Sequence, residues 1–166
     1  MSGDAGFERA VETVLAHEGG LVDDPADPGG VTNYGISLRS YPELGADGIR
    51  ALTPEQATDI YRRDWWLRYG WADLPPPIGA KLLDIGVNIG AEPVHRALQR
   101  ALRATGATVA DDGVLGPATR AAAAEADPGA LLAALRSEVA GHYRVISALH
   151  PAERRFLQGW LARAYG

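Results

Sequence analysis

Apolar residues near the start of the chain recur at the spacing of a helix that buries one face. They stand at i, i+3, i+4, i+7 and i+8, and are Phe7, Ala10, Val11, Val14 and Leu15. Eleven residues at about 100° each bring Glu18 almost directly into line with Phe7. The pattern therefore places a carboxyl group on the buried stripe, in the last turn before Gly19 and Gly20, where a glycine C-cap ends the helix.

A loop rich in turn residues follows, over residues 21–37. Two Asp-Pro pairs, a Pro-Gly and a Gly-Gly predict tight turns, and the segment 31–37 has room for a short strand or an irregular hairpin. Small polar side chains lie within fifteen residues of Glu18, among them Asp27, Thr32 and Asn33. The spacing of the loop's acidic residues does not match an EF-hand, so no metal is expected.

The rest of the chain follows helical patterns separated by proline and glycine. A capping box at 53–56 starts one helix. Residues 78–89 are apolar nearly all round, as in a central buried helix. Further helices are expected over about 92–105, 117–126 and 130–149 and from 151 onward. The pattern predicts a mainly α protein with one small non-helical lobe near the N-terminus.

Two pairs of polar or aromatic residues on these helices have more than one interpretation. Trp65 and Trp66 point about 100° apart, so one is expected in the core while the other can line a groove. Asp84 and Asn88 are one turn apart and share a face of the buried helix. Such buried polar groups either brace a loop or line a site, and bracing is favoured.

Composition excludes several classes of chemistry. The 166 residues suit one domain, or one domain with a small second lobe. The net charge of −5, without a Lys/Arg block, argues against nucleic acid, and no apolar run is long enough to cross a membrane. There is no cysteine, and the four histidines lack zinc-hydrolase spacing. The start of the chain lacks the features of a secretory signal, which indicates synthesis in the cytoplasm.

Carboxylate chemistry remains, with Glu18 as its first candidate. Partial burial and the negative end of the helix dipole both disfavour the charged carboxylate, so the group is suited to hold and donate a proton. A glutamate that bends into solvent at a frayed helix end is the alternative interpretation. Asp27 follows nine residues later, and an acid with a second carboxylate nearby is the arrangement used in glycoside hydrolysis.

The segments H-E-G-G-L-V at 17–22 and D-P-G-G-V-T-N-Y-G-I at 27–36 resemble the signature of family 108 glycoside hydrolases. These are lysozyme-like N-acetylmuramidases of phage and prophage origin. The resemblance continues at 52–57 and 60–62, at Trp66 and Asp84, and at 87–90. Residues 98–102, 112–119 and 156–163 are similar to the predicted peptidoglycan domain that usually ends this family, so nearly the whole chain is covered.

The resemblance implies a lysozyme-like helical fold with a small irregular or β-hairpin lobe near residues 21–37. It implies a catalytic lobe over 1–91 and a helical, peptidoglycan-binding-like lobe over 92–166, packed as one compact unit. The implied activity is that of an endolysin-like N-acetylmuramidase, which hydrolyses the β-1,4 bond between N-acetylmuramic acid and N-acetylglucosamine. No metal or other cofactor is implied.

Position by position, the family's catalytic glutamate corresponds to Glu18, and Asp27 is the candidate second carboxylate. Four residues separate Asp27 from Thr32, whereas the phage-type lysozyme triad has five at this point. For Asp27, a part in the chemistry and a role in fixing the loop therefore both stay open. The residues expected to contact substrate are Thr32, Asn33, Tyr34, Trp66 and Asn88.

The expected partner is the glycan strand of peptidoglycan, with neither nucleic acid nor membrane insertion involved. The protein is expected to be a monomer that reaches the cell wall through a holin or another release route. The alternative is a non-catalytic wall-binding or secretion accessory protein that keeps the fold. A peptidoglycan amidase or peptidase would need a metal or thiol site, for which the sequence has no pattern.

Overall fold

The computed structural model describes residues 2–23 and 30–166, and its mainly α class is the one predicted. The described residues form eight α-helices, several single-turn or irregular helical segments and one two-stranded hairpin. In chain order these are α1 (Ser2–Glu18), β1 (Thr32–Asn33), β2 (Ile36–Ser37), η1 (Pro42–Leu44), α2 (Gly45–Arg50), α3 (Pro54–Tyr61), the π-helical η2 (Arg62–Leu67), η3 (Trp71–Asp73), α4 (Pro76–Ile89), α5 (Ala91–Ala104), α6 (Pro117–Glu125), α7 (Pro128–Leu149), η4 (Pro151–Phe156) and α8 (Leu157–Tyr165).

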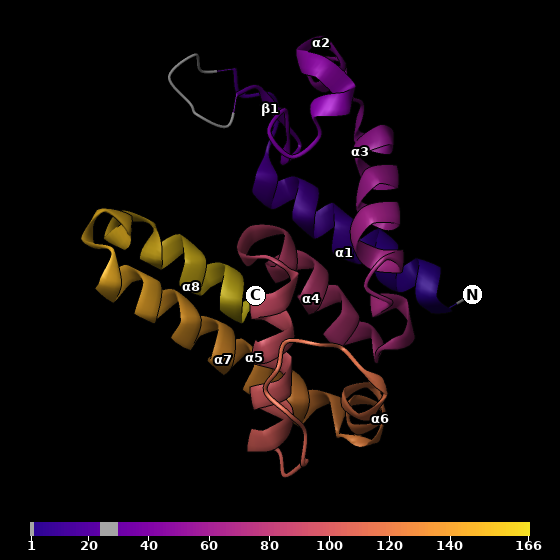
Figure 1. Ribbon diagram of the computed structural model, residues 1–166, viewed down its shortest axis with the longest axis vertical. Coiled ribbons are helices and arrows are strands. Elements are labelled where there is room, and N and C mark those ends of the chain that lie inside the picture. The colour runs from indigo at the N-terminus through magenta and orange to yellow at the C-terminus, as the bar shows by residue number, and fades with distance from the viewer. Residues whose placement is uncertain (1, 24–29) are drawn as a thin grey trace.

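Helix α4 lies at the centre of the molecule, between α1 on one side and α5 and α7 on the other (Figure 1). Its apolar residues face all these neighbours, and Ile78, Leu82, Leu83 and Ile85 are fully buried. Burial of side chains of this size stabilises the fold by roughly 1.5–3 kcal/mol each. The all-round apolar pattern therefore predicted the central position correctly.

The N-terminal elements surround the end of α1. Strands β1 and β2 pair antiparallel in the register Thr32↔Ser37, and the backbone of Val22 pairs with that of Thr32. The predicted capping box starts α3: the Thr53 hydroxyl accepts from the Gln56 N–H while the Gln56 side chain accepts from the Thr53 N–H. These contacts hold the hairpin turn over the C-terminal end of α1 (Figure 1).

The C-terminal helices form a hairpin that returns to the core. Helix α8 runs back along α7 and ends beside α4, as Figure 1 shows. Trp160 of α8 stacks on Tyr143 of α7, with 5.3 Å between the ring centroids and 19° between the planes. This stacking fixes α8 so that residues one turn further along, including Arg163, lie against α4 and the end of α1.

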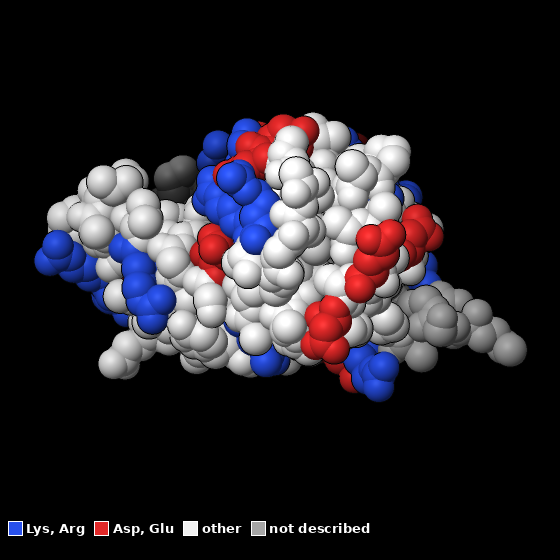
Figure 2. Space-filling model, turned by 90° about the horizontal axis from the view of Figure 1, so that it is seen from below, with Lys and Arg blue, Asp and Glu red and all other residues white. Residues whose placement is uncertain are grey.

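The surface carries both signs of charge. On the face seen in Figure 2, basic and acidic side chains form separate small patches, and no single sign dominates. With the net charge of −5, this distribution provides no long-range attraction for an anionic polymer. Within the described residues, no helix is long and apolar enough to cross a membrane.

Candidate active site

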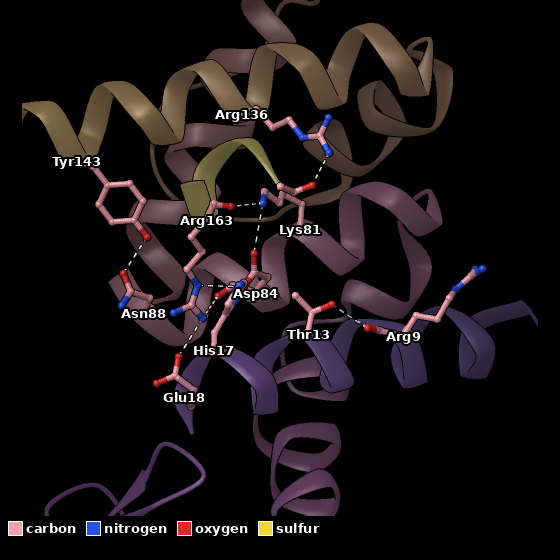
Figure 3. A network of polar contacts seen from close by, with 11 residues as sticks. Arg9, Thr13, His17, Glu18, Lys81, Asp84, Asn88, Arg136, Tyr143 and Arg163 are labelled. Carbon is pink, nitrogen blue, oxygen red and sulfur yellow. Dashed lines mark hydrogen bonds and ion pairs between the residues drawn. The ribbon is translucent and has the colours of Figure 1, made fainter. Parts of the chain in front are cut away.

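Glu18 is the last residue of α1, and Arg163 of α8 contacts it directly. Nη2 of Arg163 donates a hydrogen bond to Oε1 of Glu18 over 2.9 Å (Figure 3). The Glu18 side chain is 23% exposed and that of Arg163 only 10% exposed. The helix ends here because Gly19 adopts a left-handed φ of +73°. A carboxyl group thus stands at the edge of the core, facing an arginine that lies 145 residues later in the chain.

Asp84 of α4 fixes Arg163 in this position. Nε of Arg163 donates to Oδ1 of Asp84 over 2.9 Å, and Nη2 donates to the Asp84 carbonyl oxygen over 2.7 Å. Oδ2 of Asp84 accepts from Nζ of Lys81 over 3.2 Å, and Nδ1 of His17 lies 3.0 Å from Oδ1. Asp84 therefore braces its surroundings as expected, but the segment that it braces is α8. His17, the neighbour of Glu18 in α1, belongs to the same network although it is exposed.

The two cations differ in how burial affects them. Burial alone would lower the pKa of Arg163, but the neighbouring carboxylates of Asp84 and Glu18 outweigh this effect and raise it. For Lys81, burial dominates and lowers the pKa, although Asp84 opposes the change. Arg163 is therefore a permanent positive charge beside Glu18, and it interacts favourably with the charged form of that carboxyl group.

The hairpin turn packs on the other side of Glu18. A Cβ atom on Gly35 would lie 2.8 Å from Cγ of Glu18 and 2.5 Å from the Tyr61 hydroxyl oxygen, so only glycine fits at this point. Tyr61 donates a hydrogen bond to the carbonyl oxygen of Tyr34 over 2.8 Å. Burial, together with the nearby charge of Glu18, raises the pKa of Tyr61, which keeps the hydroxyl neutral.

A pocket of about 420 Å³ opens beside this turn, and Gly35 and Tyr61 belong to its wall. The pocket is lined by aromatic side chains and by charged ones that are partly paired with each other. The aromatic residues are Tyr41, Tyr61, Trp65 and Tyr69, and the charged ones are Glu43, Arg63, Asp64 and Arg68. Arg63 and Asp64 form an ion pair at 2.7 Å. This combination suits a ligand that has flat apolar faces and polar edges, as sugar rings do.

The structure corrects the prediction for Trp66. Its side chain is 3% exposed and packs against Phe7 at 5.6 Å between ring centroids, so it belongs to the core. Trp65, the neighbouring residue, lines the pocket. Because adjacent helical residues point about 100° apart, only one of the two tryptophans can face the pocket. The sequence pattern did not show which one.

Asn33 is also a structural residue, in contrast to its predicted place among substrate contacts. Its side chain is 4% exposed, and Nδ2 donates to the carbonyl oxygens of Ile49 and Leu52, which ties the hairpin to α2. A turn with several free carbonyl groups at the end of α2 needs such a donor. The loop composition alone did not distinguish this role from a place in a site.

Of the other predicted residues, Thr32 and Tyr34 lie in the hairpin and Asn88 lies on α4. Thr32 is half-buried and its backbone pairs with Val22. Tyr34 is half-buried in the hairpin turn, with a left-handed φ of +51°. Asn88 accepts a hydrogen bond from the Tyr143 hydroxyl over 2.8 Å. Asp27 lies outside the described residues.

Arg163 and Lys81 are residues of the network around Glu18 that the sequence analysis missed. Lys81 interrupts the apolar segment 78–89, and a lone lysine in a buried helix is a signal of a paired or functional charge. Arg163 follows Trp160 by three residues, so the two share a face of α8. Neither signal identifies Glu18 or Asp84 as the partner. No group of three or more acidic, histidine or cysteine side chains in the described part of the chain is arranged to hold a metal ion.

Comparisons with known proteins agree with this geometry. Residues 11–90 match the family described as glycosyl hydrolase 108, and residues 93–165 match the predicted peptidoglycan domain. A solved structure described as "Structure of Brucella abortus SagA" is 28% identical, with a TM-score of 0.73 over 98% of this chain and 95% of that one. Among curated proteins, none shows significant similarity. The chain belongs to glycosyl hydrolase family 108 and is a lysozyme-like glycoside hydrolase that acts on peptidoglycan.

Proposed function

We propose that the protein is an endolysin-like N-acetylmuramidase that hydrolyses the β-1,4 bond between N-acetylmuramic acid and N-acetylglucosamine. Glu18 acts as the general acid that protonates the leaving oxygen. The observation that carries the proposal is the position of Glu18, between the buried Arg163 and the hairpin turn, beside an aromatic pocket. A residue that only capped a helix would need neither the arginine nor the pocket.

Arg163 has a direct role in this mechanism. When Glu18 gives its proton to the leaving oxygen, it becomes a carboxylate in a site that is only partly open to water. Arg163, at 2.9 Å from Oε1, then stabilises the charge that develops during the step.

We assign the second carboxylate to Asp27 rather than to Asp84. Asp84 is the acidic residue joined to Glu18 through Arg163, but its side chain is 6% exposed. Its oxygens are already engaged by Arg163, Lys81 and His17, so Asp84 is available neither to attack a sugar nor to activate water. We therefore keep Asp27, nine residues after Glu18 in the sequence, as the candidate.

The aromatic pocket beside Gly35 is proposed to bind a sugar ring next to the cleaved bond. Trp65 and Tyr69 offer flat faces, with their ring centroids 6.0 Å apart. Arg68 lies at the same pocket and suits, as a hydrogen-bond donor, the lactyl group that distinguishes muramic acid from glucosamine. Tyr34 and Thr32 lie in the hairpin whose residue Gly35 packs against Glu18.

The test is Glu18→Gln, assayed on purified peptidoglycan, with Glu12→Gln as the control because Glu12 is exposed on the same helix. Wild-type protein and Glu12→Gln should release fragments that end in reducing N-acetylmuramic acid, and Glu18→Gln should release none while melting at a similar temperature. New reducing ends on N-acetylglucosamine, or new free amines, would contradict the proposed bond. Wall binding without any new ends would support the accessory protein instead.

A further inference from the structure

A second pocket, of about 260 Å³, lies between α1, α4 and α7. It shares Asp84 and Lys81 with the network around Glu18, but its other walls are separate from that site. Figure 3 shows Lys81 and Arg136 on one side of Asp84 and Glu18 on the other. The pocket has no part in the mechanism above, so its chemistry requires its own explanation.

The charged side chains that line this pocket are mostly basic. Arg9, Lys81 and Arg136 contribute three cations, and the one acidic side chain is Asp84. Asp84 already contacts Lys81, Arg163 and His17. It is therefore not free to neutralise Arg9 and Arg136. A pocket with this balance attracts an anion.

Arg136 has a donor that no described atom satisfies. Its Nη2 donates to the carbonyl oxygen of Gly166 over 2.6 Å, whereas its Nε is buried without a hydrogen-bond partner among the described residues. A buried donor without an acceptor is rare in folded proteins because its desolvation is not compensated. An anion at Arg136 would supply an acceptor for the guanidinium.

The remaining walls select the rest of the ligand. Ala10, Pro77, Ala80 and Leu132 are small or aliphatic, Thr13 adds one hydroxyl and Gly166 its backbone, and no aromatic side chain lines the pocket. Such walls suit methyl groups, whereas the pocket beside Gly35 offers the flat aromatic faces that sugars prefer. A carboxylate attached to small aliphatic residues therefore fits the pocket better than a sugar or a phosphate ester.

We propose that this pocket binds the free carboxylate of a short alanine-type peptide, such as the stem peptide that peptidoglycan carries. The identification of the peptide as a stem peptide of peptidoglycan rests on the proposed function. The preference of the pocket for a carboxylate follows from its lining residues alone. One substrate can reach both the pocket and Glu18. The pocket residues Thr13 and Arg9 lie about 7 and 14 Å from Glu18 along the axis of α1. Extended peptide covers that range in roughly two to four residues.

Binding is tested by titrating the full chain with N-acetyl-D-alanyl-D-alanine, and its C-terminal amide serves as the uncharged control ligand. The acid should bind and the amide should not. Arg136→Gln and Arg9→Gln should each weaken binding about tenfold, which corresponds to ~1.4 kcal/mol. Arg144→Gln, an exposed arginine two turns further along α7, should bind like the wild type. Equal binding of acid and amide, or no binding of either, would overturn the proposal.

Hydrolysis separates a binding role from a structural one. Arg136→Gln should lower kcat/KM on glycan strands that carry peptides and leave it unchanged on strands from which the peptides have been removed. An equal loss on both substrates would mean that Arg136 acts only by holding the end of α8 through Gly166, and the proposal would be wrong. If Glu18→Gln kept full activity, the muramidase assignment would fail while the titration result remained valid.

Discussion

Replacing Arg163 by glutamine tests the central contact of the site. The change removes the hydrogen bonds to Oε1 of Glu18 and to Oδ1 and the carbonyl oxygen of Asp84, at 2.9, 2.9 and 2.7 Å. Both carboxyl groups lose a permanent cation, and the Asp84 side chain is only 6% exposed. The variant thus perturbs the fold and the chemistry together, and the two effects are measured separately.

The expected loss of stability is about 3 kcal/mol. Removing one partner of a buried ion pair costs roughly 3–5 kcal/mol. The lower end applies because Asp84 keeps Lys81 and His17, and because Glu18 is 23% exposed and gains water. For a chain of this length the loss corresponds to a decrease in Tm of about 6–12 °C, measured by calorimetry.

Activity should fall more than the loss of stability explains. At a temperature where Arg163→Gln is still folded, kcat on peptidoglycan should fall by about 10²-fold or more, as when one donor to a developing charge is removed. Arg163→Lys should recover little, because an ammonium cannot bridge Glu18 and Asp84 as the planar guanidinium does.

The matched control is Arg144→Gln, which removes an exposed arginine that packs against neither carboxylate. It should change neither Tm nor kcat. If Arg163→Gln retained wild-type kcat while losing stability, Arg163 would be a structural residue only, and the proposed stabilisation of Glu18 would be refuted.

Three further variants test the surroundings of the site. Gly35→Ala should abolish most activity, because its Cβ would meet the Tyr61 hydroxyl at 2.5 Å and its φ is +77°, whereas Gly20→Ala, with no atom within 4 Å of its Cβ, should be active. Trp65→Ala should raise KM for glycan strands and cost less stability than Trp66→Ala, because Trp65 is only partly buried, whereas the core residue Trp66 should cost about 3–5 kcal/mol when replaced by alanine. Burial lowers the pKa of His95, so that as pH falls the unfolded chain binds a proton at this residue before the folded chain does. The free energy of unfolding, measured with urea, should therefore decrease below about pH 6.5. This decrease should be smaller in His95→Gln than in wild type.

Much of the fold follows from local rules that act within a few residues. The capping box at Thr53 starts α3 because its two hydrogen bonds need only neighbouring residues. The all-round apolar pattern of 78–89 gives the central α4, since such a helix is stable only when covered on every side. The phase of α1 similarly brings Glu18 into line with the fully buried Phe7.

The sequence by itself determined the mainly α class, the central helix and the position of a carboxyl group at the inner edge of α1. The tertiary structure decided what that carboxyl group meets. Helical phase sets the direction of a side chain within its own helix, but the partner of Glu18 lies 145 residues away and reaches it only because Trp160 and Tyr143 stack α8 on α7. The choice between Trp65 and Trp66 was likewise made by packing against Phe7, which no local pattern contains.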